Sequence, residues 1–203
     1  MSERKQKILV TGGLGFIGSH TVVALQEKGF EVIIIDDLSN SRLEVLDGIH
    51  SISGIQPTFY QIDLRDKQIL KKVFEEHKID GVIHFAASKA VGESVEKPLL
   101  YYGNNLISLV NLLEEMIEHR SENIIFSSSC TVYGQADKLP ITESAPTKPA
   151  ESPYGNTKQI GEEILRDVAK VEAINVIALR YFNPIGAHPS GLIGEFPIGY
   201  IPF

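Results

Sequence analysis

The sequence predicts an α/β protein with a doubly wound parallel sheet, a Rossmann-like fold, for three reasons. Short apolar runs alternate with helical patterns along most of the 203 residues, and this alternation is typical of parallel sheets with helices on both faces. A glycine-rich turn, TGGLGFIGSH, follows the first apolar run, KILV. The second run, EVIIID, ends in Asp36, 18 residues after Gly18, which is close to the spacing of a dinucleotide-binding unit.

The glycine turn has the composition needed to hold a pyrophosphate. Gly12, Gly15 and Gly18 recur every three residues, and Gly13 with the last two also satisfies G-x-G-x-x-G. Glycines allow a sharp turn and bring the unpaired N–H groups of a helix N-terminus close to a phosphate. The carboxylate of Asp36 can accept hydrogen bonds from an adenosine ribose. We therefore expect a nucleotide-binding βαβ unit, and the alternative is the same unit without a ligand.

The remaining elements follow in chain order. A helical pattern begins at His20, and the stretch 37–48 is at first polar and rich in turn residues. Further strands are predicted at 57–63, 81–87, 123–129 and 175–182, and further helices at 66–77, from Pro98 onward and over 154–170. The helix from Pro98 should present one apolar face, made of Leu106, Leu109, Val110, Leu113, Met116 and Ile117. Residues 134–153 have the composition of a long surface loop.

The C-terminal residues 184–203 contain four prolines and four glycines and show neither a helical nor a strand period. We therefore expect two parts: an NAD-binding domain over 1–183, and over 184–203 the start of a truncated substrate-binding lobe. The alternative is a C-terminal segment that wraps over the sheet, as loops do in compact domains.

Composition limits the partners that this chain can have. The formal net charge is −7, and binding to nucleic acid or to anionic membranes would need clustered basic residues instead. No apolar run approaches the roughly 18 residues of a membrane span. A single cysteine, Cys130, cannot form a disulfide within the chain, and no zinc-ligand spacing is present. We expect a cytoplasmic protein without a bound metal.

Three residues are candidates for catalysis. Tyr154 and Lys158 are four apart on a predicted helix, so their side chains project from the same face. A charge about 5 Å away contributes roughly 3 kcal/mol at an effective dielectric of about 20, enough to lower a tyrosine pKa by about two units. Ser129 ends the strand 123–129, and its hydroxyl could bridge a substrate oxygen and the tyrosine. Ser127 and Ser128 are competitors, and an ordinary, partly exposed Tyr–Lys pair is the alternative for the helix.

Two more reactive residue types lie near this site. Cys130 follows Ser129; it could be a reactive thiol, but free cysteines are more often small buried packing residues. His84 lies within the strand 81–87, where a core histidine is favoured over a ligand.

In this order the motifs resemble the extended short-chain dehydrogenase/reductase family, in its branch of nucleotide-sugar epimerases. The resemblance spans residues 8–191 and is carried by VTGGLGFIGSHT, DDLSNS, VIHFAASKAVGESVEKPLLYY, IIFSSSCTVYG, SPYGNTK and LRYFNPIGAHPSG. It implies a tightly held NAD and the interconversion of UDP-glucose and UDP-galactose by transient oxidation at C4, with Tyr154 taking the proton from O4. In a chain that ends at Phe203, this activity is expected to be impaired.

The resemblance also implies which residues make the contacts. The cofactor contacts fall on Gly12, Gly15, Phe16, Ile17, Gly18, Asp36, Asn40, Ser41, Asp63, Leu64, Phe85, Ala86, Ala87, Lys89, Asn104, Tyr154, Lys158, Tyr181 and Phe182. The contacts to the UDP-sugar substrate fall on Lys89, Ser129, Tyr154 and Asn183. A homodimer through the helices at 98–119 and 153–172 is implied as well, and the alternative is a monomer whose outer helix faces are solvated.

Two other functions compete with epimerisation. Nucleotide-sugar dehydratases that resemble this chain carry an Asp-Glu pair just after the serine or threonine of the fifth strand, where this chain has Cys130 and Thr131. Neither residue can serve as the acid and base of an elimination. The other alternative is a catalytically silent NAD-binding fragment.

Overall fold

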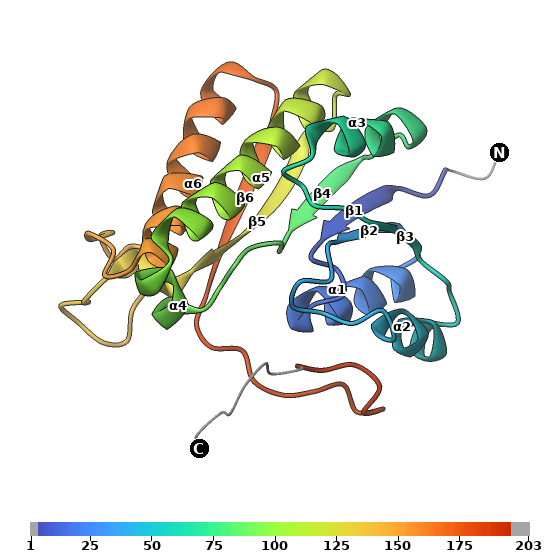
Figure 1. Ribbon diagram of the computed structural model, residues 1–203, viewed down its shortest axis with the longest axis horizontal. Coiled ribbons are helices and arrows are strands. Elements are labelled where there is room, and N and C mark those ends of the chain that lie inside the picture. The colour runs from blue at the N-terminus through green and yellow to red at the C-terminus, as the bar shows by residue number, and fades with distance from the viewer. Residues whose placement is uncertain (1–3, 196–203) are drawn as a thin grey trace.

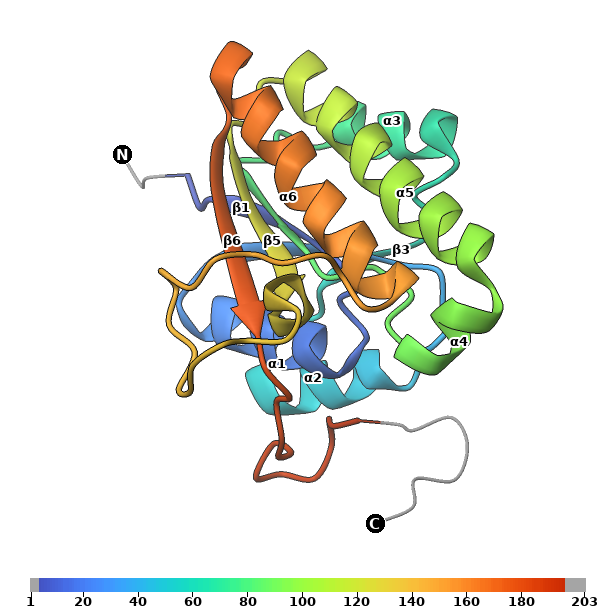
Figure 2. The same cartoon turned by 90° about the vertical axis from the view of Figure 1, so that its left-hand side faces the viewer.

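The computed structural model describes residues 4–195 and contains a six-stranded parallel sheet with helices on both faces (Figures 1 and 2). The strands are β1 (Lys7–Thr11), β2 (Glu31–Asp36), β3 (Thr58–Gln61), β4 (Gly81–His84), β5 (Asn123–Ser129) and β6 (Asn175–Tyr181). The helices are α1 (Phe16–Glu27), α2 (Val45–Ser53), α3 (Lys67–Glu76), α4 (Val91–Glu96), α5 (Pro98–Glu118) and α6 (Pro153–Val171), with a short 3-10 turn, η1, at Cys130–Tyr133. The predicted fold class is confirmed.

The strand order places a binding crevice at one end of the sheet. The strands run β3-β2-β1-β4-β5-β6, so the order reverses between β1 and β4. At such a reversal the following loops diverge and leave a crevice beyond the carboxyl ends of the strands. Thr11 and His84 are register partners at this point, and the glycine turn begins directly after Thr11.

Alternate strand residues serve two separate cores, because successive side chains of a strand point to opposite faces. Leu9 and Ile33 pack on the side of α3, α5 and α6, whereas Val10 and Ile34 pack on the side of α1 and α2. All four side chains are fully buried. Runs of consecutive apolar residues such as VIII in β2 are therefore explained by a sheet that is covered on both faces.

Several element boundaries differ from the predicted ones. Helix α1 begins at Phe16 rather than at His20, so its first turn lies inside the glycine motif. Strand β3 ends at Gln61 and β4 at His84, two and three residues before the predicted ends at 63 and 87. Helices α2 and α4 were not predicted. The strands end early because the chain leaves the sheet there to form the loops that border the crevice.

The buried face of α5 is rotated relative to the predicted one. Val110 and Ile117 are 39% and 37% exposed, whereas Leu112 and Tyr101 are completely buried. Leu109, Leu113 and Met116 are buried as predicted. The exposed residues of α5 leave an apolar strip on the outer surface of this helix.

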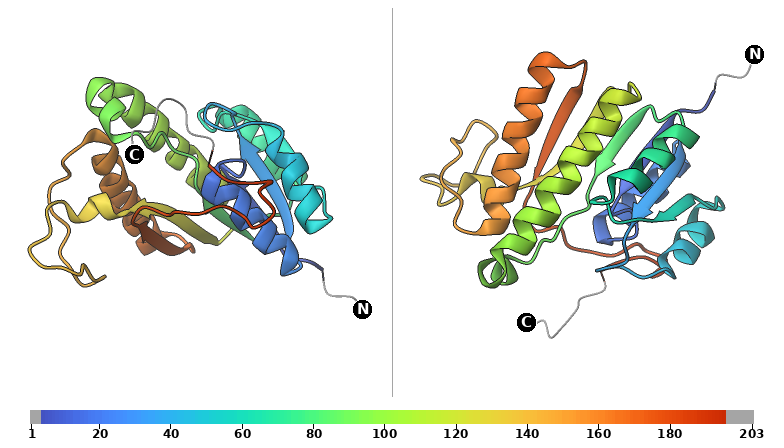
Figure 3. Two further views of the ribbon diagram at one scale, coloured as in Figure 1. Left: turned by 90° about the horizontal axis from the view of Figure 1, so that it is seen from below. Right: turned by 45° about the horizontal axis from the view of Figure 1, so that its top comes forward.

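The described part of the C-terminal segment, 184–195, has no helix or strand, and it passes below α1 and α2 (Figures 1 and 3). Ile193 is buried in the same core as these helices. A Cβ atom on Gly48 of α2 would lie 2.5 Å from the carbonyl oxygen of Leu192, so only glycine allows this close approach. Residues 196–203, the rest of the predicted second lobe, lie outside the described residues. Over 4–195, no helix is long and apolar enough to cross a membrane.

A buried carboxylate lies at the far end of α5. Glu115 is fully buried, and neither of its carboxylate oxygens has a hydrogen-bond partner among the described residues. The His119 ring lies beside it, with Nδ1 3.6 Å from Oε2. Burial raises the pKa of Glu115, and the charge of Glu118 adds to this effect. The folded state therefore holds this proton more tightly than the unfolded chain does.

We expect Glu115→Met to stabilise the protein at neutral pH by about 1–3 kcal/mol, because an unpartnered buried carboxylate is replaced by an apolar side chain of similar length. In the wild type, stability should fall as the pH rises from the ordinary carboxyl pKa through the raised one, since the charged form is the one that burial penalises. The variant should lose this decline. Urea unfolding at a series of pH values measures both effects. Glu114→Gln, at an exposed ion pair with Lys67, is the control, and a destabilised Glu115→Met would contradict the prediction.

Candidate functional site

The glycine turn after β1 is shaped by close backbone contacts. Gly12 has a φ of +67°, and a Cβ atom there would lie 2.8 Å from the backbone nitrogen of Ala86. A Cβ atom on Gly18 would press against the carbonyl oxygen of Gly12 and lie 2.8 Å from Gly13 Cα. Helix α1 thus begins directly against the turn. Its N-cap, Gly15, provides no side-chain hydrogen bond, so the N-terminal N–H groups can serve an anion.

Asp36 is held in place by three internal hydrogen bonds. Its carboxylate accepts from the backbone N–H of Leu14 and of Leu38, each at 3.0 Å, and from Ser41 Oγ at 2.6 Å. A carboxylate has about four acceptor positions, so capacity for one more donor is left. The buried Asp36 and the glycine turn are therefore one unit, since Leu14 belongs to that turn. Ser41, predicted to contact the cofactor, contacts Asp36, and Asn40 is exposed nearby.

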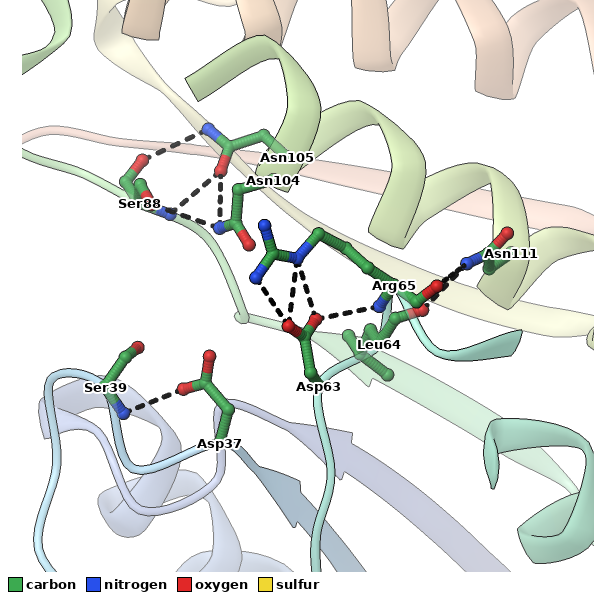
Figure 4. A network of polar contacts seen from close by, with 9 residues as sticks. All are labelled: Asp37, Ser39, Asp63, Leu64, Arg65, Ser88, Asn104, Asn105 and Asn111. Atoms are coloured by element: carbon green, nitrogen blue, oxygen red, sulfur yellow. Dashed lines mark hydrogen bonds and ion pairs between the residues drawn. The ribbon is translucent and has the colours of Figure 1, made fainter. Parts of the chain in front are cut away.

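The two predicted cofactor contacts after β3, Asp63 and Leu64, form hydrogen bonds with other residues of the protein (Figure 4). The Asp63 carboxylate accepts from the side chain of Arg65, with Nη2 at 2.6 Å and Nε at 2.9 Å, and this pairing lowers the pKa of Asp63. Leu64 is buried, and its carbonyl accepts from Asn111 Nδ2 at 2.9 Å. Both residues lie beside the crevice, and a ligand would have to share Asp63 with Arg65.

The loop after β4 is tied to two helices. The amide of Asn105 on α5 accepts from Ser88 N at 2.8 Å and donates to Ser88 O at 3.1 Å and to Thr157 Oγ1 of α6 at 3.0 Å. The neighbouring Asn104 donates to Ser88 Oγ at 3.1 Å (Figure 4). Asn105 was not predicted as a site residue; a polar residue on the inner face of an apolar helix was the available signal. Phe85, Ala86 and Ala87, at the start of the loop, are partly exposed.

Lys89, predicted to contact both cofactor and substrate, reaches the C-terminal segment. Its Nζ donates to Glu195 Oε1 at 2.9 Å, and both side chains are about half exposed. At such exposure the ion pair contributes at most about 1 kcal/mol. A ligand could therefore displace it at small cost.

Tyr154 and Lys158 lie together on the first turns of α6. Lys158 Nζ is 5.9 Å from the centre of the Tyr154 ring and 4.9 Å from that of Phe126, and it donates to the carbonyl of Ser127 at 2.7 Å. Lys158 is only 4% exposed, and burial lowers the pKa of its amine to about 8. The pair is therefore not the ordinary surface pair that was the alternative.

The expected effect of Lys158 on the tyrosine is not found. Burial raises the pKa of Tyr154, hydrogen bonding with Ser129 acts to lower it, and Cys130 acts to raise it. The prediction of a lowered tyrosine pKa was therefore wrong for the protein alone, because the sequence does not reveal how deeply the phenol is buried.

The three serines at the end of β5 have separate roles. Ser129 is buried beside Tyr154, and its Oγ accepts from Thr131 N at 3.2 Å. Ser128 points to the other side and donates to Glu162 Oε1 at 2.5 Å. Ser127 offers its carbonyl to Lys158. Of the three, Ser129 is the one placed to touch a group bound next to Tyr154.

Cys130 and His84 were predicted to be packing residues. His84 is 2% exposed, its Nδ1 lies 2.7 Å from Thr11 Oγ1, and burial, with the charge of Lys158, lowers its pKa to about 3. It is a neutral core histidine, as predicted. Cys130 is only half-buried, since it starts the η1 turn at the rim of the crevice, so the prediction of a buried cysteine was wrong.

The last residue of β6 and the two residues after it lie at the open side of the site. Tyr181 is the register partner of Ser129 and is half-buried, and burial raises its pKa. Phe182 is 55% exposed and Asn183 is also exposed. The structure thus brings Ser129, Tyr154 and Lys158 together between β5, α6 and the end of β6, next to the crevice at the glycine turn.

The chain is similar to known proteins in sequence and in structure. Residues 8–197 match the sequence profile of the NAD dependent epimerase/dehydratase family. The UDP-glucose 4-epimerase of Neisseria meningitidis serogroup B is 53% identical over 195 residues, and UDP-glucose 4-epimerase 2 of Arabidopsis thaliana is 51% identical over 198. The crystal structure of the Bifidobacterium longum UDP-glucose 4-epimerase in complex with NAD+ and UDP superimposes with a TM-score of 0.93 at 49% identity.

The matches cover most of this chain but only part of each relative. They include 96% of this chain, 58% of the Neisseria protein, 56% of the Arabidopsis protein and 58% of the Bifidobacterium chain. The chain thus spans somewhat more than half the length of the relatives that it matches.

Proposed function

The chain belongs to the NAD dependent epimerase/dehydratase family, and from this premise we propose that its residues bind NAD and supply the chemical half of a UDP-glucose 4-epimerase site. The observation that carries the proposal is the meeting of Ser129, Tyr154 and Lys158 at the end of β5, which is the neighbour of β4 on one side of the reversal of strand order. The names of the relatives support the choice of a UDP-sugar as substrate and of NAD as cofactor.

The residues present fit a dinucleotide. Gly12 and Gly18 allow a tight turn in which a Cβ atom would clash with the backbone of Ala86 or Gly12, and the N-terminal N–H groups of α1 behind this turn suit the pyrophosphate. The Asp36 carboxylate, which can accept one more hydrogen bond, would accept it from an adenosine ribose hydroxyl. The other cofactor contacts, from Phe16 and Ile17 to Tyr181 and Phe182, are proposed from the resemblance of the sequence to the family.

The chain's own residues account for proton transfer at the sugar. The Tyr154 hydroxyl would take the proton from the O4 hydroxyl and later return it, with Ser129 holding the sugar oxygen in place. The Lys158 ammonium, 5.9 Å from the centre of the Tyr154 ring, would favour the ionised phenol over the neutral one. The chemistry that NAD supplies when bound is reversible hydride transfer at C4. Lys89 and Asn183, both exposed at the open side, would meet the rest of the UDP-sugar.

Two measurements test the proposal separately. NAD binding is measured by calorimetry on the chain itself. Conversion of UDP-galactose to UDP-glucose is measured on the chain and on a chimera in which the unmatched C-terminal part of the Neisseria relative follows the last matched residue of this chain. We expect both proteins to bind NAD and the chimera to convert the sugar. A folded, NAD-loaded chimera that yields no UDP-glucose, or that yields a 4-keto-6-deoxy sugar, would overturn the epimerase assignment.

NAD should bind more tightly than NADP. The buried Asp36 carboxylate would lie close to a 2′-phosphate, and like charges in a partly desolvated site repel strongly. We expect at least about a tenfold difference in affinity, or about 1.4 kcal/mol. Calorimetric titration with both nucleotides checks this, and equal affinities would contradict the role given to Asp36.

We further propose a homodimer that functions in the cytoplasm in galactose metabolism. Leu99, Ile107 and Val110 on the outer surface of α5 are 84%, 48% and 39% exposed, and α6 lies beside α5 on the same side of the sheet (Figure 2). Pairing these two helices with their copies would cover that surface. Sedimentation at a series of concentrations tests the dimer, and a single 22.4 kDa species throughout would rule it out.

A further inference from the structure

A row of contacts joins α6 to the end of β5, and it extends beyond the residues of the proposed site to Glu162. Tyr154, Lys158 and Glu162 are spaced four apart on α6, so they form one stripe along the helix. Each meets a different serine of β5. Tyr154 meets Ser129, Lys158 Nζ meets the Ser127 carbonyl at 2.7 Å, and Glu162 Oε1 accepts from Ser128 Oγ at 2.5 Å.

The Glu162 contact is reinforced from the neighbouring strand. Arg180 on β6, the register partner of Ser128, donates through Nε to Glu162 Oε1 at 2.9 Å and through Nη2 to Oε2 at 2.7 Å. Burial acts to raise the pKa of Glu162, but the hydrogen bonds from Arg180 and Ser128 dominate and lower it. Glu162 is therefore a charged, 9% exposed group that joins α6, β5 and β6 at one point.

The packing next to this contact leaves α6 little freedom to shift. A Cβ atom on Gly161 would lie 2.8 Å from Cζ of Phe126, so the helix already approaches β5 as closely as the aromatic ring permits. The guanidinium of Arg180 lies 4.8 Å from the centre of the Tyr133 ring, which holds it from the η1 side. Bidentate Arg–carboxylate pairs fix orientation as well as distance.

We propose that Glu162, together with Ser128 and Arg180, is a positioning unit that sets the rotation and register of α6, and thereby the placement of Tyr154 and Lys158 against β5. This inference rests on the proposed function for its kinetic consequence but not for its structural one. Glu162 itself does not touch the crevice; it acts through the helix. Errors of about 1 Å in the placement of reacting groups can cost about 100-fold in rate.

The test compares Glu162→Gln with Glu163→Gln, its exposed neighbour on the solvent side of α6. In the chimera, Glu162→Gln should lower kcat by about 10- to 100-fold while leaving KM for UDP-galactose nearly unchanged. Glu163→Gln should change neither. Ser128→Ala removes one contact of the unit more gently, and in that background the effect of Glu162→Gln should shrink, as expected for residues that act as one unit.

A readout independent of turnover is the pKa of the Lys158 amine, followed by side-chain NMR of the chain itself and assigned with Lys158→Met. A shifted α6 would let water reach this amine, so its pKa should rise from about 8 toward the ordinary value in Glu162→Gln. If Glu162→Gln only removed a negative charge and left α6 in place, the pKa of the Lys158 amine would fall instead. An unchanged or lowered pKa in a cooperatively folded Glu162→Gln, or in Ser128→Ala if the former does not fold, overturns the proposal. Failure of wild type to bind NAD would overturn only the proposed function.

Discussion

Gly18→Ala should strongly weaken NAD binding and destabilise the fold. The added Cβ atom would press against the carbonyl oxygen of Gly12 and lie 2.8 Å from Gly13 Cα, and backbone atoms cannot rotate away as a side chain can. Helix α1 would have to move back from the turn, so its N–H groups would no longer face a pyrophosphate. We expect NAD affinity to fall on the order of 100-fold or more, which is about 2.7 kcal/mol, and unfolding to become easier by about 3 kcal/mol.

Gly92→Ala is the matched control for this substitution. Gly92 lies in α4, and among the described residues no atom beyond its chain neighbours and its own helix backbone lies within 4 Å of the Cβ position, so alanine there should be neutral or should stabilise the helix by up to about 1 kcal/mol. Calorimetric titration with NAD and urea unfolding are measured on both variants. Wild-type NAD affinity in Gly18→Ala would show that the turn does not hold the cofactor.

The fold was largely predictable because its strongest signals are local. Each strand is a short apolar run, and a sheet covered on both faces requires such runs. The motif from β1 to Asp36 could be interpreted because the chain must turn sharply where Gly12 and Gly18 lie. The start of α1 was placed four residues late, since its first turn has the glycine-rich composition of a loop.

Helix α2 could not be predicted because its own residues do not favour a helix strongly. The segment contains Gly48 in its interior and β-branched residues around it, both of which lower helix propensity. The helix is stabilised by burial of Val45 and Ile49 and by contact with Ile193, nearly 150 residues away in sequence. Tertiary packing of this kind is not visible in a local pattern.

The proximity of the three catalytic candidates was predictable from the sequence, but their electrostatics were not. Sequence spacing placed Tyr154 and Lys158 on one face, and strand ends placed Ser129 nearby. The hydrogen bonds that occupy Asp36 and Asp63, and the Ser127 carbonyl that holds Lys158, depend on backbone geometry. Asn105 and Glu162 were overlooked for the same reason, because their partners lie on loops and strands far away in sequence.

Tyr154→Phe should remove turnover while leaving cofactor binding intact. In the proposed mechanism the hydroxyl moves the O4 proton, and loss of a general base lowers rates by about 10²- to 10⁴-fold. The ring remains, so the packing beside Lys158, 5.9 Å from its centre, should persist and NAD affinity should change little. The chimera is assayed for UDP-galactose conversion and the chain for NAD binding.

Tyr102→Phe on α5, where the hydroxyl accepts from Asn156 Nδ2 at 2.8 Å, is the control for loss of a tyrosine hydroxyl near the same helix and should keep most of the activity. If Tyr154→Phe retained more than about a tenth of wild-type kcat, a different residue would have to move the proton, and the assignment of Tyr154 as the base would be wrong.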